Sequence, residues 1–139
     1  GANRRACQVI GLDTNVLVRY MMQDDPRQSA RATKLIESFT GEEPGFVPLV
    51  AVVELVWVLT GSYGLARAQV AAALESLLRS KELVVDRADL VTQALSRYRS
   101  AGADFADALI ERIAVAAGCA TTMTFDAGAV KAASMTPVP

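Results

Sequence analysis

The stretch QVIGLDTNVLVRY, residues 8–20, places one carboxylate between two apolar runs. The first run, residues 9–12, has the length of a short buried strand. The second run follows the polar pair Thr14 and Asn15 and begins a helix. A carboxylate between two core segments is costly unless it reaches a polar partner or a ligand. We therefore interpret Asp13 as the end of a strand, which is where parallel sheets commonly place their ligands.

The composition predicts one compact domain. The 139 residues are 52% hydrophobic and 21% charged, and a chain of this length buries about two thirds of its unfolded surface. We expect one domain over residues 1–139, with residues 1–7 as a terminal extension or expression scar. Polar residues interrupt the apolar start, and Glu54 lies within the most apolar window, so neither a signal peptide nor a membrane span is expected.

The charge and the side-chain inventory exclude several classes of site. Fourteen basic and fifteen acidic residues give a net charge of −1, whereas binding by broad phosphate neutralisation normally needs a basic protein. With no histidine, imidazole zinc sites, Ser-His-Asp triads and Cys-His pairs are excluded. Cys7 and Cys119 are too few for a disulfide framework, which favours a cytoplasmic location. We expect Cys7 to be a terminal thiol and Cys119 to be a buried small residue.

Strand-like and helix-like segments alternate along the chain. Asp25 and Pro26 form a strong helix start, and residues 50–59 are expected to be helical although their valines favour a strand. The expected strands are residues 9–12, 45–49, 83–85, 121–125 and 135–138. The expected helices are residues 15–22, 24–39, 50–59, 65–80, 88–101 and 104–117, with a weak helix after residue 126. This alternation predicts a parallel sheet with helices on both faces.

Acidic residues stand at the ends of two expected strands. Asp13 follows the first strand and Asp126 follows residues 121–125. Because the carboxyl ends of parallel strands meet at one edge of a sheet, we expect both acids at the same rim. Glu54 is the only charged residue between Glu43 and Arg67. It either occupies a salt-bridged or exposed position, or reaches that same rim.

The segment GADFADALIERIA, residues 102–114, places Asp104, Asp107 and Glu111 on one side of a helix. Taken alone, this pattern is typical of an amphipathic helix with a solvated acidic face, and Asp104 also suits the N-cap. Asp13, Glu54, Asp107 and Asp126 come from four separate segments. If they gather at one rim, their repulsion either raises their pKa values or demands a cation. Mg²⁺ or Mn²⁺ fits such oxygen ligands, and a phosphodiester is then the expected substrate.

Four motifs occur in order along nearly the whole chain: GLDTNVLVRY at 11–20, VVELVWVL at 52–59, GADFADALI at 102–110 and TFD at 124–126. Together they resemble the PIN-domain ribonucleases, specifically the VapC-like toxins of bacterial toxin–antitoxin pairs. The resemblance implies a three-layer α/β/α sandwich with a central, mainly parallel sheet. It also implies an endoribonuclease that depends on Mg²⁺ or Mn²⁺, forms a homodimer and is silenced by a cognate antitoxin.

The resemblance assigns metal binding and catalysis to four acids: Asp13, Glu54, Asp107 and Asp126. Asn15 and Thr124 match supporting polar positions that orient ligands or water. Asp104 stands where the family often has a small polar residue, so it is either a cap or an additional support for the metal. Glu111 matches no required position and is expected at the surface, paired locally with Arg112 or solvent.

Other interpretations stay open. A PIN-family nuclease of RNA processing or of DNA, without an antitoxin, would carry the same acids. A PIN fold used only for Mg²⁺ binding is less expected than catalysis, because all four carboxylates are present. A receiver-like signalling domain is disfavoured because VVDRAD, residues 84–89, lacks the surrounding pattern and no lysine ends TTMTFD. An apolar cluster at Trp57, Val58, Leu59 and Tyr63 is expected to be mostly core, and an exposed part would suit an antitoxin helix.

Overall fold

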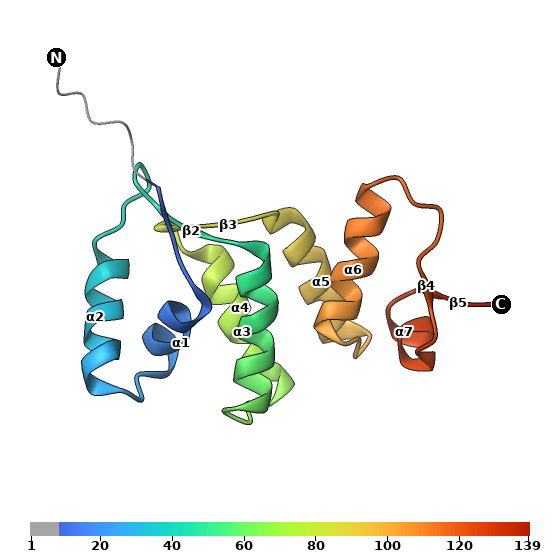
Figure 1. Ribbon diagram of the computed structural model, residues 1–139, viewed down its shortest axis with the longest axis horizontal. Coiled ribbons are helices and arrows are strands. Elements are labelled where there is room, and N and C mark those ends of the chain that lie inside the picture. Colours follow the sequence, from blue (N-terminus) through green and yellow to red (C-terminus); the bar gives the residue numbers. More distant parts are fainter. Residues whose placement is uncertain (1–8) are drawn as a thin grey trace, which may run out of the picture.

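Three parallel strands form the central sheet of the computed structural model, which describes residues 9–139 (Figure 1). The strands are β1 (Ile10–Gly11), β2 (Gly45–Val47) and β3 (Leu83–Val85), in the order β1-β2-β3. Gly11 is paired with Phe46, and Phe46 with Val84. The amide of Leu12 extends the ladder by donating to the carbonyl of Phe46 at 2.9 Å. The predicted parallel sheet is therefore confirmed.

Seven helices accompany the strands within residues 9–139. The helices are α1 (Thr14–Met22), α2 (Pro26–Glu37), α3 (Leu49–Gly61), α4 (Arg67–Arg79), α5 (Ala88–Ser100), α6 (Phe105–Ala116) and α7 (Ala127–Ala132). None of those described is long and apolar enough to cross a bilayer. The α/β/α fold class predicted from the sequence is confirmed. The predictions for residues 1–7, including the thiol of Cys7, fall outside the described residues.

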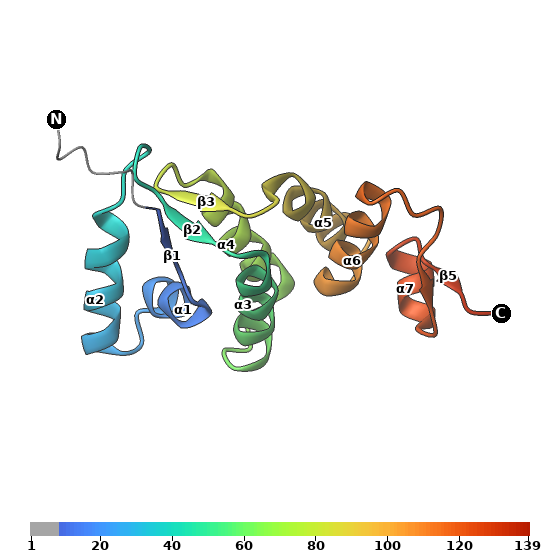
Figure 2. The ribbon, with the colours of Figure 1, turned by 45° about the horizontal axis from the view of Figure 1, so that its top comes forward.

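The last two strands form a sheet of their own. β4 (Met123–Thr124) pairs in parallel with β5 (Thr136–Pro137), so Met123 lies beside Thr136. Figures 1 and 2 show this pair with α7 at one end of the molecule, whereas β1, α1 and α2 lie toward the other end. Helices α5 and α6 stand between them. The chain therefore does not return to lay β4 beside β1.

Local sequence explains where the helices begin. The carboxylate of Asp25 accepts from the amide of Gln28 at 2.9 Å, and Pro26 occupies the first helical position. Helix α3 forms despite its β-branched residues. Its buried positions follow helical spacing: Ala51, Val52, Leu55, Val56 and Leu59. Burial of that face outweighs the intrinsic preference of valine for strands.

An aromatic cluster fixes the turn between α5 and α6. The rings of Tyr98 and Phe105 meet edge to face, with centroids 6.2 Å apart. The guanidinium of Arg67, at the start of α4, lies 3.9 Å from the centre of the Tyr98 ring. Its Nη2 also donates to the carbonyls of Tyr98 and Ala103. These contacts tie the α5–α6 pair to α4.

Two expectations about individual residues are wrong. Glu111 is buried, with 6% of its surface exposed, because α6 packs against α5 and brings Arg97 to the helix face that carries this acid. Cys119 is an exposed free thiol. It follows the end of α6 in the loop that leads to β4, where the chain has left the core.

Candidate functional site

One pair of acids lies where β1 meets α1 and α3. Asp13 caps α1, and its Oδ1 accepts from the amide of Thr14 at 2.8 Å. The hydroxyl of Thr14, which is buried, donates to Oε1 of Glu54 at 3.0 Å. Both carboxylates are exposed. One threonine therefore joins the two acids, and we call Asp13, Thr14 and Glu54 the N-terminal acidic group.

Thr14 is not among the site residues predicted from the sequence. The available signal was a hydroxyl beside a strand-end acid, at the first position of a helix. Its contact spans forty positions in the sequence, so no local pattern identifies Glu54 as the acceptor. Thr14 reaches Glu54 because α1 packs against α3.

Asn15 faces a different part of the surface. It is exposed and lines a hollow of about 400 Å³ between α1 and α2, together with Arg19, Gln28 and Arg31. Nε of Arg19 donates to Gln28 at 2.8 Å, and its Nη1 lies 3.3 Å from a carboxylate oxygen of Asp24. Arg19 is therefore held within the protein, and Arg31 is the exposed cation at this hollow.

A second set of acids lies at the start of α6. The Oδ1 atom of Asp104 accepts from the amide of Asp107 at 3.0 Å, so Asp104 is the N-cap of α6. Partial burial raises the pKa of Asp107, and the negative charges of Asp104 and Asp126 raise it further. The charges of these three acids are thus close enough to interact. We call Asp104, Asp107 and Asp126 the C-terminal acidic group.

Asp126 begins α7. Its Oδ1 atom accepts from the amide of Gly128 at 2.7 Å, and its own amide donates to the hydroxyl of Thr124 at 3.0 Å. Thr124 therefore orients the main chain at Asp126, directly after β4. This arrangement positions the carboxylate at the carboxyl end of a strand.

The two acidic groups follow strands of different sheets. Asp13 follows β1 and Asp126 follows β4, and these strands belong to different sheets. The shared rim expected from the sequence requires β4 to be hydrogen-bonded into the central sheet, and β4 is paired with β5 instead. Among residues 9–139, no three Asp, Glu or Cys side chains gather closely enough to hold a metal ion.

The individual residues suit a hard divalent cation. Carboxylate and hydroxyl oxygens are the donors that Mg²⁺ and Mn²⁺ prefer. The N-terminal acidic group supplies two carboxylates, and the C-terminal acidic group supplies three. The four acids that the family resemblance assigns to the metal are divided between the two groups.

Glu111 has a structural role. Oε1 accepts from Nε of Arg112 at 2.7 Å, and Oε2 accepts from its Nη2 at 3.0 Å. Arg97 lies 3.6 Å away. The hydrogen bonds from Arg112, together with the charges of both arginines, lower the pKa of this carboxyl. The predicted pairing with Arg112 is confirmed.

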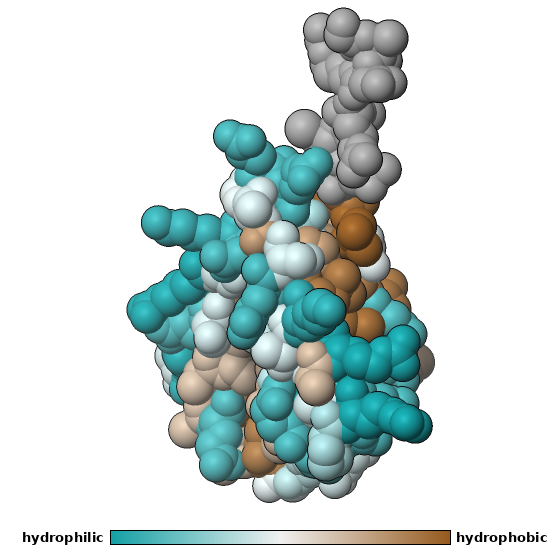
Figure 3. All heavy atoms as spheres, turned by 90° about the vertical axis from the view of Figure 1, so that its left-hand side faces the viewer, coloured by the Kyte–Doolittle hydropathy of each residue, from teal (hydrophilic) through white to brown (hydrophobic). Residues whose placement is uncertain are grey.

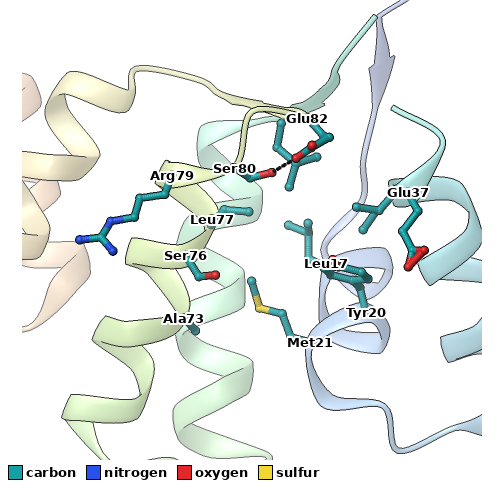
Figure 4. A pocket seen from close by; sticks show the side chains of 12 residues that line it. Leu17, Tyr20, Met21, Glu37, Ala73, Ser76, Leu77, Arg79, Ser80 and Glu82 are labelled. Atoms are coloured by element: carbon teal, nitrogen blue, oxygen red, sulfur yellow. Dashed lines mark hydrogen bonds between the residues drawn. The ribbon is translucent and has the colours of Figure 1, made fainter. Parts of the chain in front are cut away.

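Another hollow lies between α1, α2 and α4 and has a volume of about 770 Å³. Figure 4 shows Leu17, Tyr20 and Met21 of α1 facing Ser76 and Leu77 of α4 across it. None of the seven site residues predicted from the sequence lines it.

Comparison with known families identifies the class. The model of the PIN domain matches residues 10–134, and the chain therefore belongs to the PIN-domain family. PIN domains are generally nucleases and typically bind divalent metals. A search of curated proteins found no match.

Proposed function

We propose that this chain is an endoribonuclease that depends on Mg²⁺ or Mn²⁺ and acts as the toxin of a toxin–antitoxin pair. The observation that carries the proposal is the family match over residues 10–134, with acids at all four motif positions. A divalent ion bound by such acids lowers the pKa of coordinated water and offsets the charge of a phosphodiester.

The protein groups have separate tasks in this proposal. The N-terminal acidic group keeps two carboxylates in place through the hydroxyl of Thr14. The C-terminal acidic group concentrates negative charge around Asp107, whose raised pKa reflects both its burial and its acidic neighbours. A bound cation would neutralise this negative charge, and its binding is therefore favourable.

In this proposal the protein contacts RNA through a small part of its surface. The net charge of −1 does not support broad phosphate binding. Arg31 is exposed beside Asn15 at the hollow between α1 and α2. Only Lys131 is basic in residues 127–139. We therefore expect modest affinity for RNA and a shallow dependence of binding on salt concentration.

The proposed protein partner is a cognate antitoxin. Trp57 is 60% exposed on α3, whereas Leu59 is completely buried, so part of the apolar cluster predicted from the sequence faces solvent. An exposed aromatic residue on a helix suits contact with an apolar helix of a partner. A small DNA-binding protein encoded in the neighbouring reading frame, and its co-purification with this chain, would support the toxin assignment.

Cleavage of matched RNA and DNA oligonucleotides tests the activity. With Mg²⁺ or Mn²⁺ we expect the purified protein to cut RNA and leave 5′-phosphate ends, and EDTA to stop the reaction. Asp107→Asn should reduce cleavage to background. Asp86→Asn is the matched control, because Asp86 follows β3 at a strand end and lies outside the predicted set.

Two results would contradict the proposal. Undiminished cleavage by Asp107→Asn, in protein free of contaminating nuclease, would remove this acid from the mechanism. Cleavage of DNA alone would replace the ribonuclease assignment with the DNA-nuclease alternative.

A further inference from the structure

Helix α2 carries a row of positively charged side chains on its outer face. Arg27, Arg31 and Lys34 stand at positions i, i+4 and i+7, so they lie along one side of the helix. All three are exposed, and we call them the basic row of α2. Figure 3 shows the side of the molecule on which α2 lies, where hydrophilic side chains project into solvent. The buried residues of α2 lie on the opposite side of the helix: Ser29, Ala32 and Ile36.

Most other cations of the described chain are engaged in contacts. The ion pairs within residues 9–139 are formed by Arg19, Arg79, Arg87, Arg97, Arg99 and Arg112. Arg67 lies over the ring of Tyr98. Outside the basic row, only Lys81 and Lys131 of the described residues have neither kind of contact. Unpaired positive charge is therefore concentrated on one face of α2.

The acids nearest to the row in the sequence make other contacts. Asp25 caps α2 by accepting from the amide of Gln28. Asp24 pairs with Arg19 and accepts from the hydroxyl of Tyr63 at 2.6 Å. Glu37 lines the hollow between α1, α2 and α4, as Figure 4 shows. The row therefore presents positive charge to solvent, where it attracts anions.

The position and length of the row suit a nucleic-acid strand. Arg31 lines the hollow of about 400 Å³ between α1 and α2, and so does Asn15, which follows Asp13 by two residues. From Arg27 to Lys34 the helix rises about 10 Å. A stacked strand has one phosphate per about 3.4 Å, so this length spans about three phosphates, one for each cation. An acidic peptide matches the charge equally, but the closeness of the hollow to Asp13 favours a nuclease substrate.

We propose that the basic row of α2 binds the phosphates of a single RNA strand and directs that strand past Asn15 toward Asp13. The role of the row in placing a substrate rests on the proposed nuclease function, whereas its affinity for nucleic acid does not. Phosphate contacts carry no sequence information. The row therefore supplies affinity and position, and it does not select the sequence that is cut.

The salt dependence of binding tests the row without reference to cleavage. Fluorescence anisotropy of a labelled uridine oligonucleotide measures the affinity of the full-length chain in EDTA. Each phosphate contact with a single strand adds about 0.7 to the slope of log K against log salt concentration. Arg31→Gln combined with Lys34→Gln should therefore reduce that slope by about 1.4. If the row makes three contacts, a fourfold increase in salt should weaken binding about 18-fold in wild type and about threefold in the double variant.

Two matched variants control for net charge and for side-chain shape. Lys81→Gln combined with Lys131→Gln removes the same charge from exposed positions outside α2, and it should keep the wild-type slope. Arg31→Lys combined with Lys34→Arg keeps the charge of the row and should also keep the slope. An equal loss of slope in both glutamine pairs would overturn the proposal, as would an unchanged slope in the α2 pair or the absence of RNA binding by wild type. Tighter binding of polyglutamate than of RNA would replace RNA with an acidic protein segment.

Cleavage assays separate this inference from the proposed function. With Mg²⁺, the α2 glutamine pair should raise KM for RNA and leave kcat unchanged, because the row contacts the substrate equally in the ground state and the transition state. Cleavage with the same KM in wild type and in this pair would overturn the role of the row and leave the nuclease assignment intact. A wild type that binds RNA with the expected slope and cuts none with Mg²⁺ or Mn²⁺ would support the row and contradict the nuclease assignment.

Discussion

Hydrogen bonds to the main chain determine how the individual acids are oriented. Asp13, Asp104 and Asp126 each accept from an amide in the first turn of a helix. One oxygen of each carboxylate is thereby engaged, and the second is available to another ligand. An N-cap can therefore also serve as a metal ligand, and only substitutions that preserve capping distinguish the two roles.

Asp104 is the residue for which this distinction is sharpest. We expect Asp104→Ala to lower the free energy of unfolding by about 1 kcal/mol, because the amide of Asp107 loses its acceptor. Asp104→Ser retains a capping oxygen, so it should keep both the stability and the rate of RNA cleavage. Urea denaturation and oligonucleotide cleavage measure the two effects. A serine variant with native stability and no cleavage would instead make Asp104 part of the metal site.

Glu111 gives the protein a pH-dependent contribution to stability. Its pKa is lowered in the folded state by Arg112 and Arg97, so the carboxylate stabilises the fold above the pKa of the unfolded chain. This contribution is lost as the pH falls through the lower pKa of the folded state. Glu111→Gln should cost roughly 1–3 kcal/mol at neutral pH.

Urea denaturation of wild type and Glu111→Gln between neutral and acidic pH measures this contribution. The difference between the two proteins should shrink as the pH falls below the usual range of glutamate. Glu37→Gln, which removes an exposed carboxylate on α2, is the control and should show no such trend. A difference that is constant over the whole pH range would contradict the electrostatic explanation.

At the scale of elements, the helices were largely predictable because their signals are local. The Asp25–Pro26 start of α2 lies where the sequence places it, and strand β3 has the predicted bounds. Helix α3 required a choice against valine propensity, and the helical spacing of its buried residues explains why it forms. The spacing of apolar residues and the capping residues determine whether a segment is a helix or a strand, and both signals come from residues that are neighbours in the sequence.

Helix α3 also shows which apolar residues stabilise the fold. Leu59 has no exposed surface, whereas Trp57 on the same helix is 60% exposed. We expect Leu59→Ala to lower the free energy of unfolding by about 2–5 kcal/mol. Trp57→Ala should change it by no more than about 0.5 kcal/mol. Denaturation followed by far-ultraviolet circular dichroism measures both, and an equal loss from the two variants would contradict the observed burial.

The partners of the elements were less predictable than their types. The sequence identifies Thr121–Phe125 as a strand region but carries no local signal that β5, rather than β1, pairs with it. In the sequence, Asp104, Asp107 and Glu111 form one polar side of a helix. In the structure, Glu111 is buried against α5 beside Arg97, whereas Asp104 is exposed. Burial and strand pairing depend on contacts between distant segments, which a single sequence does not display.

At the scale of the whole molecule, the acids form two groups, each attached to a separate sheet. The N-terminal group is connected to the central sheet through β1, and the C-terminal group extends from α6 to α7 beyond β4. The proposed function assigns the metal ion to acids of both groups. The change of stability on adding a metal ion therefore tests whether both groups bind it.

Thermal unfolding with Mn²⁺ makes this measurement. At a free concentration about a hundred times the dissociation constant, a bound ion adds about 2.7 kcal/mol of stability, so the Tm of wild type should rise and EDTA should reverse the rise. Asp13→Asn and Asp126→Asn should each remove most of it, because one ion needs both groups. Asp86→Asn should keep it. A full rise in Asp13→Asn would show that the C-terminal group binds the ion alone.

The outer edge of β1, beside which residues 9–139 place no further strand, has a consequence for handling the protein. An open strand edge with an exposed apolar side chain, here Ile10, offers a template for pairing between molecules. Concentrated preparations should therefore tend to aggregate, and Ile10→Lys should reduce that tendency.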